Sequence, residues 1–355
     1  MRELLQKNPY NRPNLVNFRR VRNSEWTGVK LMNSAYYHLN VRDIDQAYFH
    51  DFEIEVDVAS QHHLSKLISA LPFPLNTDGI DPAGSNILIE RVNITNYDDA
   101  VAVKPSDKKY KLAQCSENIM VRDMKVWWSV GLTIGSVPAE DDYNCIRNVT
   151  FQDSVMHHPY KGIYVKTNPG DTTSMLPGSG GEITDITYDN IEIHNPVWWG
   201  IYIGPQQQKQ PGGGGPGCMT YPFGGCETNP RIAMNNITLN NIRQYDSLLP
   251  PGIIRCNETA ECHGFVWNNV HATGLGGWWE FLGLNFISEH VHGEVTDSTP
   301  NPGLDGKVHH FKLGKFAKKF LKKEAIKIAK HFICSHLSWL PCEEFGEKLE
   351  TLYAV

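Results

Sequence analysis

A long internal repeat is the feature of this sequence that most restricts its fold. Short runs of a small residue, an apolar residue, any residue and an apolar residue recur at intervals of 31, 31 and 38 residues. Each run alternates with the two-residue period of a β-strand, and a repeat of about 20–50 residues is typical of stacked coils. The runs are Ala100–Val103, Gly131–Gly135, Gly162–Lys166 and Gly200–Gly204.

A second series of β-prone runs precedes the first in each repeat. No amphipathic helical pattern lies between the two series, which disfavours a βαβ fold. The alternative, an antiparallel sandwich, would give hairpin turns at intervals of about 8–12 residues and no long repeat. We therefore predict an all-β chain, folded as a parallel β-helix. The second series is Ile89–Ile94, Val121–Val126, Val149–Val155, Ile186–Ile193 and Ile237–Ile242.

The repeat predicts one large domain over residues 1–299 and a different segment over residues 300–355. A solenoid needs a cap over its first coil, and the repeat is already under way at Val29–Leu31, so we expect that N-terminal coils are missing. Residues 307–355 hold ten lysines and five glutamates, a net charge of +5, whereas the whole chain carries −6. Apolar residues at helical spacing between Lys315 and His331 predict a Lys-rich amphipathic helix, which either lies on an anionic surface or caps the solenoid.

Cysteines and sequons indicate an exported protein. The composition, 41% hydrophobic and 20% charged, is that of a globular chain. No apolar run approaches the roughly 20 residues of a membrane span, and residues 1–9 lack the apolar stretch of a signal peptide. We expect a secreted glycoprotein that has lost its leader. The close cysteine pairs are Cys218/Cys226, Cys256/Cys262 and Cys334/Cys342, and the sequons begin at Asn93, Asn148, Asn236 and Asn257.

Carboxylates stand at the edges of two β-prone runs about twenty residues apart, Asn76–Asp81 and Tyr97–Lys104. Residues one coil apart stack roughly 4.8 Å from one another, so Asp78 is expected beside Asp98 and Asp99 in one open groove. Adjacent residues of a regular strand point to opposite faces, so Asp98 and Asp99 can both reach the groove only if the strand bends there. Like charges raise one another's pKa. The cluster should therefore hold a proton donor beside ionised partners, as glycoside hydrolysis requires.

Four ordered blocks carry a resemblance to a known family. Asn76–Gly79, Asp98–Asp99, Gly131–Ser136 and Tyr164–Lys166 resemble the signature blocks of polygalacturonase-like glycoside hydrolases of family 28, and the similarity runs from about residue 12 to about residue 298. The resemblance implies a right-handed parallel β-helix that hydrolyses α-linked galacturonan or related pectin with inversion. It implies Asp98 as the general acid, with Asp78 and Asp99 as the bases that hold the attacking water.

The acid and base of an inverting glycosidase stand roughly 6.5–9.5 Å apart, and Asp78 is expected to provide that gap from its own coil. Substrate contacts are expected from residues in or near the same blocks and from a glutamine-rich loop. They are Asn76, Lys104, Tyr164, Lys166 and Gln206.

Two positions depart from the family pattern. Val130 stands where the family has a histidine that helps to set the protonation of the acid. Tyr164 stands where the family has an arginine of an Arg-x-Lys clamp, and a phenol does not replace a guanidinium. The pattern fits an enzyme for a different uronide linkage or chain end, and equally a protein that has lost activity.

Two other functions remain open from the sequence. One is a catalytically inactive β-helix that binds polysaccharide or protein, and the other is a calcium-dependent pectate lyase. The pairs His157-His158 and His309-His310 have no cysteine or carboxylate at ligand spacing, so we expect neither a metal nor another cofactor. We expect a pectic polysaccharide as partner, no nucleic acid, no integral membrane segment and a monomer.

Overall fold

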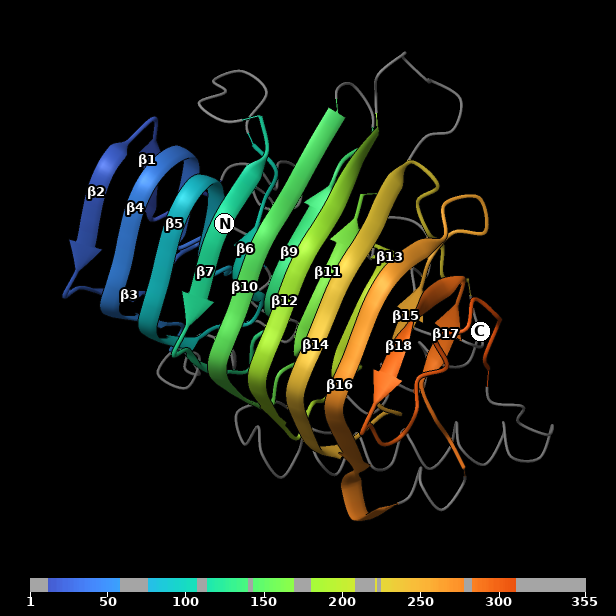
Figure 1. Ribbon diagram of the computed structural model, residues 1–355. Helices are drawn as coiled ribbons and strands as arrows, with labels where there is room; N and C mark the ends of the chain where they lie inside the picture. The colour runs from blue at the N-terminus through green and yellow to red at the C-terminus, as the bar shows by residue number, and fades with distance from the viewer. Residues whose placement is uncertain are drawn as a thin grey trace.

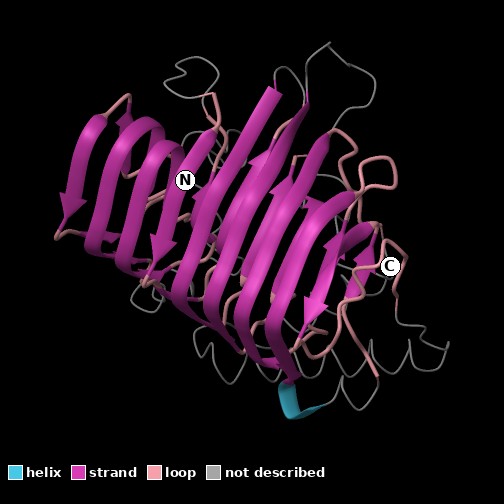
Figure 2. Ribbon diagram, in the orientation of Figure 1, coloured by secondary structure: helices cyan, strands magenta, loops and turns pink. Residues whose placement is uncertain are grey.

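The structure is a computed structural model, and it describes residues 12–57, 76–106, 114–139, 143–168, 180–207, 221, 225–277 and 283–310. Strands dominate this part of the chain, and its one helical segment is the short 3₁₀ turn Leu275–Gly277 (Figure 2). No helix among the described residues is long and apolar enough to span a membrane. The strands stack in parallel rows, one coil beside the next (Figure 1).

One row contains the long strands, which pair in parallel with strands of the neighbouring coils. The first coil is made of β1 (Val16–Arg19), β2 (Arg22–Thr27) and β3 (Lys30–Met32), all of which pair with β4. The row continues through β4 (Leu39–Glu55), β5 (Ile80–Thr95), β7 (Ser116–Arg122) with β8 (Lys125–Trp127), β10 (Tyr143–His157), β12 (Gly180–His194), β14 (Ile232–Ser247), β16 (Cys262–Gly274) and β18 (Val291–Thr296).

A second row contains the shorter strands, which lie behind the long ones in Figure 1. It contains β6 (Asp99–Val103), β9 (Gly131–Val137), β11 (Ile163–Thr167), β13 (Ile201–Gln206), β15 (Gly252–Arg255) and β17 (Ile287–Glu289). These strands also pair in parallel, which an antiparallel sandwich would not show. The predicted all-β fold, a parallel β-helix, is confirmed.

Asparagine and aspartate explain how the long strands turn. Most long strands contain two residues with positive φ five positions apart, such as Asn148 and Asp153, or Asp185 and Asn190. Asn and Asp accept this left-handed conformation more readily than other non-glycine residues. Equivalent side chains then bond from coil to coil, since Asn148 Nδ2 donates to Asn118 Oδ1 at 2.7 Å. The polar corners therefore fix both the bend and the stacking register.

These corner ladders bear on the glycosylation prediction. The sequon residues Asn148 and Asn236 both use their side-chain Nδ2 atom, to which a glycan would be attached, as a donor within a ladder. Asn257 Nδ2 donates to Thr228 Oγ1 at 3.2 Å. Asn93 lies exposed on β5. At three of the four predicted sequons the Nδ2 atom is therefore already engaged in a hydrogen bond.

Apolar columns fill the interior of the coils. Ile87, Ile119, Val149, Ile186 and Ile237 are in register on five successive long strands, and each is at most 2% exposed. Burying a side chain of this size stabilises a fold by about 1.5–3 kcal/mol. Equivalent apolar positions of successive sequence repeats therefore form one column of the core.

Disulfides connect described parts of the solenoid. Cys115–Cys145 joins two adjacent coils, and its residues are 30 apart in sequence. Cys256–Cys262 closes a short loop, as the sequence predicts. Cys226 is also disulfide-bonded, whereas Cys218, Cys334 and Cys342 lie outside the described residues.

The segment after residue 300 is described only as far as residue 310. Its Leu304 is buried in the core, and Ser288 and His309 exchange backbone hydrogen bonds across an antiparallel bridge. The predicted Lys-rich helix over residues 315–331 lies outside the described residues. The domain division at residue 300 stays a prediction.

Candidate active site

Stacking brings the predicted carboxylates together. The Gly79 amide donates to the Asp99 carbonyl at 2.9 Å, so the end of one coil lies directly against the next. One side-chain oxygen from each of Asp78, Asp98 and Asp99 lies within 4.8 Å of the other two. The buried Asn96 amide donates to the carbonyls of both Thr77 and Asp99, which ties the two segments together.

The two adjacent aspartates have different surroundings. Asp98 immediately precedes β6, and its carboxyl oxygens accept hydrogen bonds from the backbone amides of Asn76 (2.7 Å) and Asp99 (2.9 Å). Asp99 is the first residue of β6, and it accepts from Thr133 Oγ1 at 2.8 Å and from Lys166 Nζ at 2.7 Å. Both carboxyls can therefore face the same cluster because one of them stands before the strand begins.

Exposure separates the three carboxyls. Asp78 is 3% and Asp99 1% exposed, while Asp98 is only half-buried. The open groove expected from the sequence is therefore not seen for the first two, which lie beneath the surface, and Asp98 is the member that meets solvent.

The environments push the pKa values apart. Burial raises the pKa of Asp98, and the charge of Asp99 raises it further. Burial acts on Asp99 too, but the ammonium groups of Lys166 and Lys104 outweigh it and hold the pKa of that carboxyl below its usual value. Burial, then the charge of Asp98, raises the pKa of Asp78 well above its usual value. Neighbouring carboxyls whose pKa values are shifted in opposite directions commonly serve as the acid and the base of a reaction.

The separation of the carboxyls is shorter than expected. Inverting glycosidases place their two carboxyls roughly 6.5–9.5 Å apart, and the sequence predicts that Asp78 provides such a gap. The observed limit of 4.8 Å between side-chain oxygens is close to the spacing of neighbouring coils. Stacking brings the groups together, so their separation gives no support for inversion.

Asp81 is a fourth carboxylate, which the sequence analysis did not assign to the site. It is fully buried, and its oxygen Oδ2 lies 3.7 Å from Lys104 Nζ and 3.9 Å from Arg42 Nη2. Burial raises the pKa of Asp81, and the two cations oppose this. Lys104 also donates to the Gly135 carbonyl at 3.0 Å. The predicted substrate contact Lys104 is therefore engaged within the protein.

Residues of the preceding coil support Asp78 and Asn76. The predicted substrate contact Asn76 accepts a hydrogen bond from Arg12 Nη2 at 2.5 Å. Backbone and ring nitrogens of His38 both contact the Asp78 carbonyl, and the other ring nitrogen accepts from the Ser34 amide. Burial lowers the pKa of His38, so this ring is neutral and orients the turn at Asp78.

Val130 lies one coil beyond Asp98, as its amide donates to the Asp98 carbonyl at 2.9 Å. The next residue, Gly131, has a φ of +108°, and a Cβ there would stand 2.2 Å from the Gly162 carbonyl oxygen. Only glycine fits such an approach. The turn therefore fixes the backbone of residue 130 one coil from Asp98, and the Val130 side chain packs against the cluster that contains Tyr164.

Lys161 is a cation that the sequence analysis missed. Tyr164 is 2% exposed and points its ring at two ammonium groups, with Lys161 Nζ 3.8 Å and Lys166 Nζ 4.5 Å from the ring centroid. Lys161 Nζ also lies 4.3 Å from the centre of the Tyr202 ring. The tyrosine at the predicted arginine position is thus covered by a lysine from the preceding turn.

Gln206, at the end of β13, was predicted to contact substrate. Its side chain donates to the Thr228 carbonyl at 3.2 Å, and its amide donates to the Glu227 carbonyl at 2.9 Å. These contacts tie it to the residues before β14. The structure does not bring Gln206 into contact with the three aspartates.

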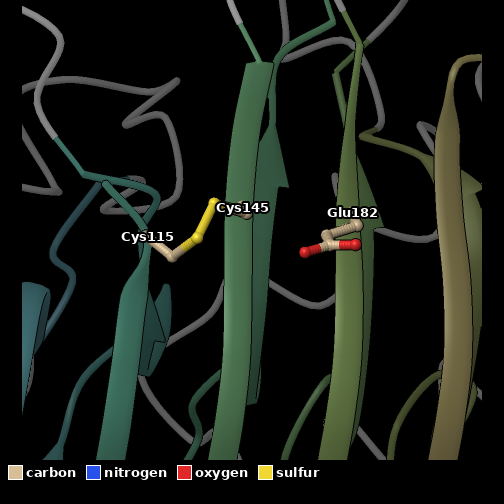
Figure 3. Close-up of side chains that lie close together, drawn as sticks. All are labelled: Cys115, Cys145 and Glu182. Atoms are coloured by element: carbon tan, nitrogen blue, oxygen red, sulfur yellow. A yellow bond between two sulfur atoms is a disulfide. The ribbon is translucent and has the colours of Figure 1, made fainter. Parts of the chain in front are cut away.

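Cys115, Cys145 and Glu182 lie close enough together to resemble a metal site (Figure 3). The two cysteines form a disulfide, however, so their sulfur atoms are not thiolate ligands. This group therefore holds the coils together.

A parallel β-helix with buried, differently tuned carboxylates on one coil edge defines a candidate polysaccharide-cleaving protein. Residues 5–285 match the family model described as glycosyl hydrolases family 28. The chain belongs to this family.

Curated relatives match over a smaller part of their length. The protein named "Probable endopolygalacturonase I" of Aspergillus terreus is 30% identical over 201 residues, which cover 56% of this chain and 46% of that protein. Polygalacturonase 1 of Penicillium olsonii is 35% identical over 129 residues, covering 36% and 30%. The chain thus aligns with less than half the length of either relative.

Solved structures agree with the fold. Endo-xylogalacturonan hydrolase from Aspergillus tubingensis has a TM-score of 0.58 at 17% identity, with 88% of this chain and 71% of that chain covered. Endopolygalacturonase I from Stereum purpureum, complexed with two galacturonate, has a TM-score of 0.52 at 16% identity, with 80% and 69% covered.

Proposed function

We propose that this protein hydrolyses α-linked galacturonan in pectic polysaccharide, with inversion. The observation that carries the proposal is the contrast between adjacent residues. Lys166 Nζ lies 2.7 Å from Asp99 and keeps that carboxyl ionised, whereas burial and then the charge of Asp99 raise the pKa of the half-buried Asp98. Family membership and the relatives named polygalacturonase support the substrate class.

In the proposed reaction Asp98 gives its proton to the glycosidic oxygen as the bond to the anomeric carbon breaks. Asp99 takes a proton from the attacking water, which Asp78 helps to orient. The water oxygen becomes the new anomeric hydroxyl, and proton exchange with solvent restores both carboxyls. General acid and base catalysis of this kind contributes about 10²–10⁴-fold each.

Two other functions are tested against this one. A binding protein without activity is favoured by the burial of Asp78 and Asp99. A calcium-dependent pectate lyase would need a cation among the carboxylates and a strong base, and Lys166 in contact with Asp99 opposes cation binding there.

One assay separates the three functions. Polygalacturonate is incubated with the protein, with and without a chelator, and reducing ends and unsaturated uronides are measured separately. Reducing ends that survive chelation, without unsaturated product, are expected. Unsaturated product that the chelator abolishes would identify a lyase, and no product under any condition would leave a binding protein.

The substitution Val130→His is expected to move the alkaline limb of the kcat profile to lower pH. The imidazole would lie one coil from Asp98, and its protonated form would favour the ionised carboxylate and so lower the pKa of the acid. Val130→Asn is the matched control, because it is polar but does not titrate. Equal shifts in both variants would contradict this explanation.

Lys161 is proposed to provide the positive charge that Tyr164 lacks. Burial, then the charge of Lys166, lowers the pKa of Lys161 to about 7, so the ammonium loses its proton as the pH rises through neutrality. Lys161→Met should raise the KM for polygalacturonate severalfold and change the KM for methyl-esterified pectin little, because that substrate lacks the carboxylate charge. Lys161→Arg keeps a positive charge and should return the KM for polygalacturonate towards the wild-type value. An equal rise in KM for both substrates would contradict a charge contact.

We also propose that the protein acts outside the cell. The disulfides Cys115–Cys145 and Cys256–Cys262 support this, since such bonds persist mainly in oxidising compartments.

A further inference from the structure

Three imidazoles and a carboxylate meet on the last coils, far along the solenoid from the aspartates. Glu261 precedes β16, His263 lies on β16, His290 precedes β18 and His292 lies on β18. One ligand atom from each of Glu261, His263 and His292 lies within 4.8 Å of the other two. The sequence analysis considered only adjacent histidine pairs, and this group forms across coils.

The β-helix brings the cluster together by register. Cys262 pairs with Val291, so the next residues, His263 and His292, are neighbours on adjacent coils. Their rings stack with centroids 4.7 Å apart and planes at 16°. Both follow a buried residue, so both side chains point outward.

Glu261 connects the imidazoles. Its oxygen Oε2 lies 2.7 Å from His292 Nε2, and its other oxygen lies 3.6 Å from His290 Nδ1. The side chains of Glu261 and His292 are 37% and 40% exposed, so an ion can reach them from solvent.

The backbone around the cluster is held in place. The Cys256–Cys262 disulfide ends at the residue between Glu261 and His263. The Cys262 amide donates to the His290 carbonyl at 3.0 Å, which fixes the two coils at this point. A Cβ at Gly306 would stand 2.2 Å from the His292 ring, so glycine there leaves the ring its space.

We propose that Glu261, His263 and His292 bind a divalent transition-metal ion, with Zn²⁺ as the best match, and that His290 or water completes the site. Zinc takes imidazole nitrogen and carboxylate oxygen at about 2.0–2.2 Å in tetrahedral sites, so neighbouring ligand atoms stand about 3.3 Å apart. The contacts of Glu261, 2.7 Å to His292 and 3.6 Å to His290, lie below and above this 3.3 Å separation. Rotation of the imidazole rings would bring the ligand atoms to it. The imidazole nitrogens favour zinc, copper or nickel over calcium, which prefers oxygen ligands.

The site would close the C-terminal end of the solenoid. It joins β16 to β18, the last two long strands among the residues that the structure describes. The inference is independent of the proposed hydrolysis, because the cluster shares no residue with the aspartate site.

Zinc binding to the full chain, without a histidine tag and after metal removal, is the test. Isothermal titration at pH 7.5 is expected to give one Zn²⁺ per chain and a raised thermal midpoint, and Co²⁺ is expected to give the visible absorption of a tetrahedral site. Binding should weaken as the pH is lowered, because protons compete with a metal ion for nitrogen and oxygen ligands.

Two variants decide the location of the ion. His263→Gln with His292→Gln should weaken binding by more than the about 10–100-fold that loss of an outer partner causes. His271→Gln is the matched control, because His271 lies on the same strand and bonds to Asn269 Oδ1 at 3.1 Å, outside the cluster. The absence of stoichiometric binding to the wild type, or unchanged affinity in the double variant, would overturn the proposal. A double variant that fails to fold is replaced by Glu261→Gln, which must also weaken the binding.

Discussion

Asp98→Asn is expected to reduce kcat on polygalacturonate by about 10²–10⁴-fold, to background, because an amide nitrogen cannot protonate the leaving oxygen. The change preserves size, and an amide oxygen can still accept the bond from the Asn76 or the Asp99 amide. We therefore expect the KM and the thermal midpoint to change little. Initial rates of reducing-end release measure the effect.

The matched control is Asp123→Asn. Asp123 is exposed at a left-handed corner of the solenoid, where asparagine is equally suitable. It should leave kcat unchanged. If wild type and Asp98→Asn release reducing ends at the same background rate, the protein is a binding module.

Lys166→Met is expected to have the second large effect, on both catalysis and stability. The ammonium and the Asp99 carboxylate are 5% and 1% exposed and 2.7 Å apart. Removing one partner of a buried ion pair destabilises a protein by about 3–5 kcal/mol. The thermal midpoint should fall accordingly.

The same substitution should shift the pH dependence. The depressed pKa of Asp99 adds stability above the pKa of the unfolded carboxyl, and this is lost as the pH falls through the folded value. Without Lys166 the pKa values of Asp99 and Asp98 both rise, because the ammonium lowers both. The acid and alkaline limbs of kcat should therefore move to higher pH. Lys125→Met, at an exposed position on β8, is the control and should move neither.

The fold could be predicted because each repeat of the sequence forms one coil of the β-helix. Gly131, Gly162 and Gly200 recur at the start of successive short strands, and each apolar position after them faces the same side. Stacking follows from the period without knowledge of distant contacts. Residues 311–355 carry no such period, and their predicted helix remains untested.

The meeting of Asp78, Asp98 and Asp99 followed from the same period. Their partners did not, because Lys166 reaches Asp99 across 67 residues and from another coil. The sequence analysis assigned Lys166 to the substrate. In the structure it contacts Asp99, so its loss should affect kcat as well as KM.

The sequence did not predict which charged side chains are buried. Asp81 lies in the same run as Asp78 and was given no role from the sequence, yet it is fully buried between Lys104 and Arg42. Lys161 was given no role from the sequence, and only the structure shows that it is buried with its ammonium over the Tyr164 ring and over the Tyr202 ring of the next coil. Exposure depends on which coils and loops cover a residue, and the repeat does not encode that.

The most direct test of the central claim is the anomeric proton spectrum during digestion of a galacturonate oligomer. Hydrolysis with inversion of α-linkages, with Asp98 as the acid, predicts that the β-anomer of the new reducing end accumulates first and reaches the α-anomer only by mutarotation. The same signals should be absent with Asp98→Asn. The α-anomer appearing first, an unsaturated uronide, or no new reducing end with the wild type would each contradict it.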